Sequence, residues 1–196
     1  MCYTFDMKSY FDKYDKQIFE MMSNPSWWID RQKRRKQELL KYARRVHSNS
    51  SISSKMGGLL LWQQVLEQFL KEIIHISISY IKAEIWPTRV DLKVNFKNKT
   101  FGVILNDYEN YSLDYKDKSK ILTKLKLVND NRNTIVHKIF EVDNLENLET
   151  YFEESFNTYE DLLPLLLDHY INNCYYLEDL KKRVDWQDFL DDINDK

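Results

Sequence analysis

The sequence predicts an all-helical protein, a bundle of about four or five helices with an N-terminal helical extension. The 196 residues include only three Gly and three Pro, too few for the many tight turns of a sandwich or a barrel. Hydrophobic residues make up 43% and charged residues 31%, which is a globular rather than a disordered composition. Several long segments also carry apolar side chains at spacings of three and four, the period of an α-helix.

Two helices are expected before the strongest apolar pattern begins. Residues 5–22 have apolar side chains at roughly helical spacing, and a second helix is expected at 27–47. The Ser-rich segment 47–58, closed by two glycines, predicts a break in the chain. We therefore expect an N-terminal helical arm at 1–50.

The strongest apolar stripe starts at Leu59 and ends before Trp86-Pro87. Its members alternate spacings of three and four and so share one helix face: Leu59, Trp62, Leu66, Phe69, Ile73, Ile76 and Tyr80. Four more apolar residues widen the stripe, so this helix should pack on more than one side: Leu61, Val65, Leu70 and Ile74. This helix opens the bundle proper, which we expect to occupy 57–184.

A short extended insertion is expected after this helix, near 88–99. Residues 90–96 alternate strictly between apolar and polar side chains, a pattern typical of extended chain. Another short helix should start at Phe101.

Two long helices are expected after residue 115. Residues 116–140 read as helical, with a break near residues 129–131. A further helical pattern extends from Phe152 to Leu177, and Pro164 within it should kink the helix or divide it in two.

The net charge of −2 conceals an uneven distribution of charge. Residues 141–196 hold sixteen Asp or Glu against four Lys or Arg, a net of −12, so residues 1–140 carry +10. The end of this acidic region, 185–196, is expected to be a tail. A basic body suggests a polyanionic partner, and an acidic tail suggests a restraining or pairing role. The alternative, a merely soluble helical surface, weighs about equally.

The densest positive charge lies in the second expected helix. Between Arg31 and Arg45 the chain has eight positive charges and one Glu. Such a run can follow an RNA backbone, or it can be the wet face of an amphipathic helix or a partner for the acidic half. RNA contact is slightly favoured, and the candidate RNA-binding residues are Arg31, Lys33, Arg34, Arg35, Lys36, Arg44 and Arg45.

Composition and spacing argue against several classes of protein. No apolar run is long enough to span a bilayer, and the N-terminus lacks the apolar core of a signal peptide, so a cytoplasmic location and no membrane partner are expected. Cys2 and Cys174 form no disulfide framework. No Cys/His spacing predicts zinc and no Gly-rich loop predicts a nucleotide site, so neither a metal nor a cofactor is expected.

The candidate catalytic residues lie in the segment NDNRNTIVHKIF, residues 129–140. Asn133 and His137 are four apart and therefore share a helix face. Arg132 adjoins Asn133 near the start of the expected helix, so a cation, an amide and an imidazole should cluster at one helix end. Judged by spacing alone, such residues more often lie on a solvent-exposed helix face than in a catalytic site.

The run Arg132-Asn133-x-x-x-His137 resembles the signature of the HEPN superfamily, which is Arg, a polar residue, a short spacer and His. The segment LLLWQQVLEQFLKEII (59–74) is similar to the apolar first core helix of that family. The segment TFGVIL (100–105) resembles one often found ahead of the motif. The resemblance extends over about 57–180 by position, but only the short motif is specific.

The resemblance implies metal-independent cleavage of RNA by an HEPN-type antiparallel helical bundle. In that chemistry a 2′-hydroxyl attacks the adjacent phosphorus, which leaves a 2′,3′-cyclic phosphate and a 5′-hydroxyl. His137 would be the acid/base, Arg132 the phosphate clamp, and Asn133 would orient His137 or the scissile phosphate. Because a single His cannot easily reach both sides of an in-line displacement, the family dimerises around a shared cleft, and a homodimer is expected.

Family analogy further suggests a toxin or anti-phage (abortive infection) effector, held or activated by an antitoxin or other regulatory protein. In the toxin branch paired with a nucleotidyltransferase antitoxin, a Tyr closely follows the His. Here Lys138, Ile139 and Phe140 follow His137, which puts that partnership in doubt. The alternatives are a non-catalytic HEPN module for scaffolding or dimerisation and an RNA-binding module without cleavage. Such relatives often lose a motif residue, and all three are present here, so catalysis ranks first.

Overall fold

The computed structural model describes residues 25–49, 51–85, 92, 94–138 and 146–183, without the side chains of 25–33, 138, 146, 147 and 181. Within this part of the chain every regular element is an α-helix, which confirms the predicted all-helical fold. The helices are α2 (Pro25–His47), α3 (Ile52–Glu84), α4 (Phe101–Tyr111), α5 (Lys118–Lys138) and α6 (Glu146–Arg183). The helix expected at 5–22 and the acidic tail at 185–196 lie outside the described residues.

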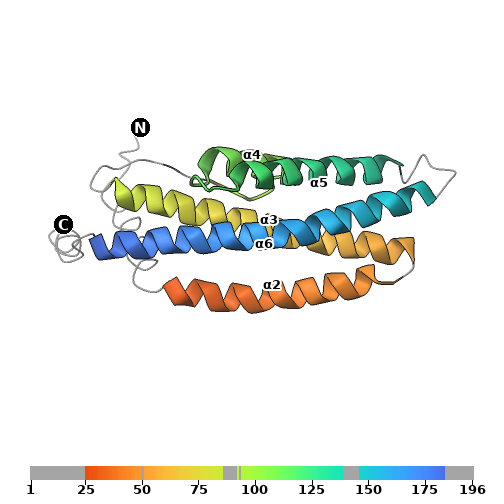
Figure 1. Ribbon diagram of the computed structural model, residues 1–196, viewed down its shortest axis with the longest axis horizontal. Helices are drawn as coiled ribbons and strands as arrows, with labels where there is room; N and C mark the ends of the chain where they lie inside the picture. The colour runs from red at the N-terminus through yellow and green to blue at the C-terminus, as the bar shows by residue number, and fades with distance from the viewer. Residues whose placement is uncertain (1–24, 50, 86–91, 93, 139–145, 184–196) are drawn as a thin grey trace, which may run out of the picture.

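The helices form three layers (Figure 1). α3 and α6 lie side by side in the middle layer, α2 covers one side of it, and α4 and α5 cover the other. Trp62 of α3 stacks on Tyr159 of α6, and further along both helices Phe69 contacts Tyr170. Residue numbers therefore rise in the same direction along the two helices, so α3 and α6 are parallel. The predicted antiparallel arrangement therefore holds for the chain neighbours α2/α3 and α5/α6 but not for this central pair.

The apolar stripe predicted for α3 is the centre of the core. Its buried members are Leu59, Trp62, Leu66, Phe69 and Ile73, and the widening residues Val65, Leu70 and Ile74 are buried as well. Burial on more than one face follows from the position of α3 between α2 and α4, with α6 beside it. The helix ends at Glu84, just before Trp86-Pro87, as predicted.

The turn between α2 and α3 is shorter than the predicted break at 47–58. α3 is already helical from Ile52, and Ser51 caps it, since its hydroxyl accepts a hydrogen bond from the Ser54 amide at 3.2 Å. The glycines therefore lie inside a helix instead of a loop. At Gly58 an added Cβ would lie 2.9 Å from the Cβ of His47 and 3.0 Å from the carbonyl oxygen of Ala43, so this position permits a close crossing of α2 and α3.

Gly58→Ala should lower the free energy of unfolding by about 1–3 kcal/mol, because the methyl group would press on the backbone of α2. Gly57→Ala is the matched control, since its Cβ would meet only Val46 Cγ1 at an ordinary 3.5 Å. We expect Gly57→Ala to be neutral or stabilising by up to about 1 kcal/mol, because Ala favours a helix interior over Gly. Urea titrations followed by circular dichroism measure both variants, and equal stability in the two would contradict the close crossing.

α2 packs against the bundle as one of its layers. Leu40 and Ala43 belong to the same buried core as the residues of α3 and α6. Arg44 also reaches across to α6, where its Nε and Nη2 each donate a 2.6 Å hydrogen bond to Glu160. The boundary predicted near 50–57 therefore lies between two helices, α2 and α3, that share one core.

The described part of the extended insertion lies in no helix, as predicted. Leu92, Val94 and Phe96 pack against the core, while Asn95 and Lys97 are exposed. The alternation in the sequence arises because the apolar side chains of this segment face the bundle and the polar ones face solvent. α4 then begins at Phe101, as predicted.

Neither of the two breaks predicted in the C-terminal helices divides a helix. α5 continues through residues 129–131, and α6 continues through Pro164. Tertiary packing overrides both local signals. Val128 and Ile135 are buried on either side of residues 129–131 in α5. Leu162 and Leu166, on either side of Pro164 in α6, are 0% exposed. The buried neighbours hold the backbone helical where Asn and Pro alone would favour an end.

Candidate functional site

The motif residues lie in the last two turns of α5, at its C-terminal end rather than near its start as predicted. The position differs because α5 is unbroken at residues 129–131. Asn133 and His137 are exposed, and their spacing of four places both on one outward face of the helix. The imidazole is thus accessible to a large substrate.

Arg132 lies on the inner flank of that face and is half-buried. Its Nε is enclosed and finds no hydrogen-bond partner among the described residues. Burial raises the pKa of the Tyr159 phenol, and the positive charge of Arg132 opposes this rise, so the guanidinium lies near this residue of α6. Because Nε is enclosed, only the terminal nitrogens of the guanidinium could bind an anionic oxygen of a substrate.

Two buried polar side chains lie in this part of α5 and α6, and the sequence analysis did not single out either of them. The ion pair between Lys124 and Asp161, at 2.8 Å, sets the antiparallel register of α5 and α6. Counting seven residues forward along α5 and seven back along α6 from this pair brings Asn131 level with Glu154, the residue before Ser155. Asn131 and Ser155 are both at least nine-tenths buried, and Asn131 Nδ2 and Ser155 Oγ have no hydrogen-bond partner among the described residues. The signal in the sequence was polar residues at core-facing helical positions.

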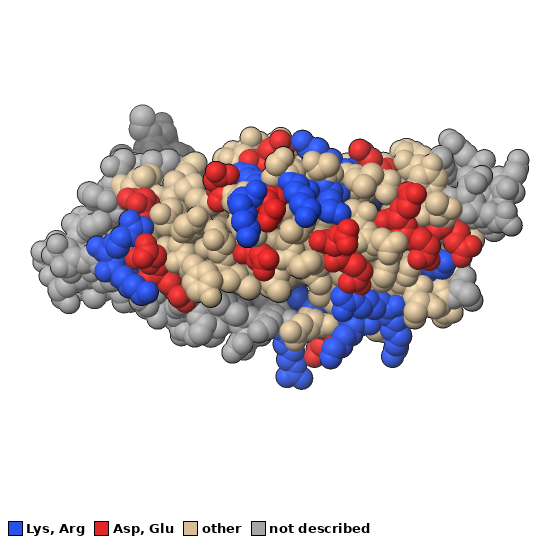
Figure 2. Space-filling view, viewed as in Figure 1, with Lys and Arg blue, Asp and Glu red and all other residues tan. Residues whose placement is uncertain are grey.

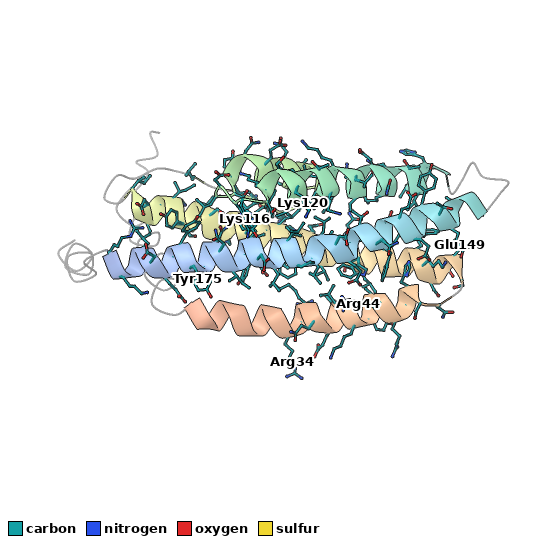
Figure 3. The ribbon with its side chains drawn as sticks, viewed as in Figure 1. Arg34, Arg44, Lys116, Lys120, Glu149 and Tyr175 are labelled. Carbon is teal, nitrogen blue, oxygen red and sulfur yellow. The ribbon has the colours of Figure 1, made fainter. Side chains whose placement is uncertain are left out.

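The acidic groups at this end of the bundle are held by a lysine. Lys55 of α3 donates to Glu149 at 2.5 Å and to Glu153 at 3.0 Å, and these hydrogen bonds raise the pKa of its ammonium group. Glu149 lies near the start of α6, at the same end of the molecule as the last turns of α5 (Figure 3). An anionic substrate at this end would therefore meet two carboxylates whose negative charge Lys55 offsets only in part.

The candidate RNA-binding residues of α2 separate into surface and core positions. Arg34, Arg35 and Arg45 are exposed, whereas Arg44 is held by Glu160. Lys36 corrects the sequence reading, because it is buried and forms an ion pair with buried Glu72 of α3. The spacing of four from Lys36 to Leu40 places both on the core-facing side of the helix. The side chains of Arg31 and Lys33 lie outside the described residues.

The exposed cations of α2 form the lower edge of the molecule in Figure 2. On the face shown there, acidic and basic side chains alternate over α5 and α6, whereas α2 is mainly basic. The basic surface predicted from the sequence is thus present along α2 without Lys36, and two of its members are already paired, Arg34 with Glu38 and Arg44 with Glu160.

His169 serves the core rather than the candidate site. It is fully buried, shares a 2.7 Å hydrogen bond with the Tyr108 hydroxyl and stacks on Tyr115 with ring centroids 4.7 Å apart. Burial lowers the pKa of this imidazole to about 4; Lys118 acts in the same direction, against the Leu113 backbone and Asp114. His169 therefore joins α6 to α4 as a neutral ring.

This burial predicts a loss of stability in mild acid. The unfolded imidazole takes up a proton below its ordinary pKa of 6.5, while the folded one resists protonation until about pH 4. The His169 contribution is thus fully present above pH 6.5 and declines by about 3 kcal/mol as the pH falls to 4. Urea titrations from pH 7 to 5 should show a shallower slope for His169→Gln than for the wild type, and identical slopes would contradict this assignment.

The described residues include no group of three His, Cys, Asp or Glu side chains arranged to hold a metal ion. None of the described helices combines the length and apolar character needed to cross a membrane. Comparison of the chain with family models, curated proteins and solved structures finds no match. The proposed function therefore rests on the residues themselves and on the motif resemblance.

Proposed function

We propose that this protein is a metal-independent endoribonuclease of the HEPN type, which cleaves RNA by attack of a 2′-hydroxyl on the adjacent phosphorus. The observation that carries the proposal is the Arg132-Asn133-x-x-x-His137 motif at the accessible end of α5 in an all-helical bundle. The motif brings an exposed His and a half-buried Arg to the same end of α5, and this chemistry uses both residue types.

His137 supplies the proton transfer in the proposed reaction. Imidazole is the side chain best suited to exchange a proton near neutral pH. Asn133, one turn earlier on the same face, is placed to orient either the ring or a phosphate oxygen. The exposure of both side chains leaves room for an RNA strand against this face.

Arg132 stabilises the negative charge that develops on the phosphorane. Its guanidinium is half-buried, so its position is restricted, and its Nε has no acceptor of its own within the described residues. A cation in a restricted position is effective at stabilising a transition-state charge. This combination favours a phosphate-clamp role over a structural ion pair.

A homodimer completes the proposed site. One His cannot both remove a proton from the attacking oxygen and supply one to the leaving oxygen on the opposite side. Two copies of the motif in one cleft meet this need, and the exposed face with Asn133, Val136 and His137 is available for such a contact. The exposed cations of α2, Arg34, Arg35 and Arg45, would contact the RNA backbone. The role as a toxin or anti-phage effector, with a regulatory partner protein, rests on family analogy.

The test is incubation of total cellular RNA with the purified protein in EDTA, followed by analysis of the product ends. We expect 2′,3′-cyclic phosphate and 5′-hydroxyl ends, with no requirement for a divalent metal. RNA binding without cleavage would favour the non-cleaving RNA-binding module. Absence of both binding and cleavage by a folded dimer would favour a scaffolding module.

A further inference from the structure

We infer that the outward face of α2 is a binding site for single-stranded RNA, where a base stacks on Tyr42 and the surrounding cations bind the phosphates. The choice of RNA as the ligand rests on the proposed function. The site is additional to the motif, because α2 and α5 cover opposite sides of the middle layer. Its evidence is an exposed aromatic ring in the centre of a positively charged helix face.

Tyr42 occupies the outward face of α2. Leu40, which belongs to the core, lies two positions earlier, so Tyr42 is turned about 200° around the helix, away from the core. The tyrosine is 51% exposed. Arg45 follows it by three residues and Arg35 precedes it by seven, which places both cations on the same face. Lys41 lies at the edge of this face.

The outward face carries more cations than acids. Its exposed charged members among the described residues are Arg34, Arg35, Lys41 and Arg45, against one acid, Glu38. Glu38 pairs with Arg34 at 3.2 Å, and 86% of the Arg34 side chain and 65% of the Glu38 side chain are exposed. A pair so open to solvent contributes little stability and can give way to a phosphate. Four cations against one carboxylate leave a net charge of +3, which attracts a polyanion.

Arg45 places a phosphate-binding group beside the Tyr42 ring. Its guanidinium carbon lies 5.3 Å from the ring centroid, the distance of a cation–π contact. The ring keeps an open surface for a base, since the tyrosine is 51% exposed despite this contact. A base stacked there would bring its phosphates within reach of the guanidinium. Aromatic rings beside positive charge are the usual means by which proteins bind single strands.

The aromatic ring makes the site selective for single strands. In a duplex the bases are paired and stack on one another, so none is available to Tyr42. The cations alone do not make this distinction, because phosphates are present in both forms of RNA. The tyrosine therefore decides which class of RNA the face prefers.

Tyr175 of α6 is an exposed tyrosine in the opposite electrostatic setting. It is 65% exposed, and two acids follow it by three and four residues on the same face, Glu178 and Asp179. An RNA backbone would meet carboxylates beside this ring. Tyr175 is therefore the matched control for Tyr42.

The face of α2 is remote from the motif. Ion pairs of α6 with α2 and with α5 set the register of the three helices. By that register Tyr42 is level with residue 162 of α6 and His137 with residue 148. The two side chains are therefore about 21 Å apart along the bundle, at about 1.5 Å per residue, and lie on opposite sides of it. Only a long strand can contact both.

A binding measurement on the full chain tests the stacking. In a His137→Ala background, the affinity is measured for a labelled oligouridine long enough to span both sites. Tyr42→Leu should weaken binding about 5- to 100-fold, the usual effect of losing one stacked base. Tyr42→Phe, which keeps the ring, and Tyr175→Leu should each change the affinity by less than about twofold. Tyr42→Leu should leave the affinity for a duplex RNA unchanged.

The salt dependence tests the cations separately. Arg45→Gln and Lys41→Gln should each reduce the slope of log affinity against log salt concentration by about 0.7, the effect of one lost phosphate contact on a single strand. Lys120→Gln, which removes an exposed cation of α5, should leave the slope unchanged. Tyr42→Leu should lower the affinity without changing the slope, because stacking releases no counterions.

Several outcomes would overturn the α2 site. These are equal losses in Tyr42→Leu and Tyr42→Phe, equal losses in Tyr42→Leu and Tyr175→Leu, an equal loss on duplex RNA, and no RNA binding by a chain with native circular dichroism. Cleavage assays on the chain with His137 intact separate this site from the proposed function. Cleavage by a chain whose RNA binding ignores Tyr42→Leu would overturn only the α2 site. Tyr42-dependent binding without cleavage would overturn only the proposed function.

Discussion

Replacing His137 by Ala should lower the rate of RNA cleavage by about 10²–10⁴-fold, the usual contribution of a general acid or base. The side chain is exposed on the outward face of α5, so its removal takes nothing from the core. Loss of an exposed side chain changes the free energy of unfolding by about 0.5 kcal/mol or less. Initial rates on a fluorogenic single-stranded RNA in EDTA, with circular dichroism and gel filtration, separate activity from folding.

Variants of Arg132 and of Lys120, an exposed lysine of α5, test whether a change in the cleavage rate is specific to the motif. Arg132→Ala should cost about 10²–10³-fold in rate, because a fixed charge at the phosphorane is lost. Arg132→Lys should recover only part of this, since an ammonium group lacks the planar fork of donors. Lys120→Ala removes an exposed cation at the other end of the helix and should leave the rate unchanged. Full activity in folded His137→Ala would sink the catalytic assignment.

Replacing Glu72 by Gln should lower the free energy of unfolding by about 3–5 kcal/mol, because Lys36 would then carry an uncompensated buried charge. The two side chains form an ion pair, and only 9% of the Lys36 side chain and 3% of the Glu72 side chain is exposed. Gln68 also donates to Glu72 at 3.0 Å, and the Lys36 ammonium lies 4.1 Å from the centroid of the Phe69 ring. The charge is therefore enclosed by a carboxylate, an amide and an aromatic face.

A double variant separates a charge effect from a packing effect. Lys36→Met/Glu72→Leu removes both charges and keeps the approximate volume, so we expect it to recover most of the loss. The exposed pair Lys126–Glu109, at 3.4 Å, is the control, and Lys126→Ala should cost about 1 kcal/mol or less. Urea denaturation measures all three variants. A cost for Glu72→Gln no larger than that for Lys126→Ala would mean that the buried pair does not hold α2 to α3.

The same ion pair explains why α2 can present a basic surface. A helix with many cations is poorly suited to pack against a core, and the buried residues among its described side chains are few: Lys36, Leu40, Ala43 and His47. Two ion pairs attach α2 to the rest of the bundle. Lys36 pairs with Glu72 of α3, and Arg44 pairs with Glu160 of α6. The other described Lys and Arg side chains of α2 are exposed to solvent: Arg34, Arg35, Lys41 and Arg45.

Residue spacing alone determined much of this protein. The helical period of α3, its end before Trp86-Pro87 and the start of α4 at Phe101 were predictable because apolar periodicity reports directly which face is buried. The motif could be found for the same kind of reason: Asn133 and His137 share a face in any helix that contains them. Local patterns therefore sufficed for the fold class and for the candidate residues.

Tertiary structure alone decided the remaining features. Asn129, Asn131 and Pro164 favour helix ends locally, yet the helices continue because buried neighbours on both sides stabilise the helical backbone. Lys36 looked like its neighbours Arg34 and Arg35 in sequence, and only the contact with Glu72 on another helix removes it from the surface. The parallel pairing of α3 and α6 likewise depends on contacts between residues far apart in the chain, which no local pattern encodes.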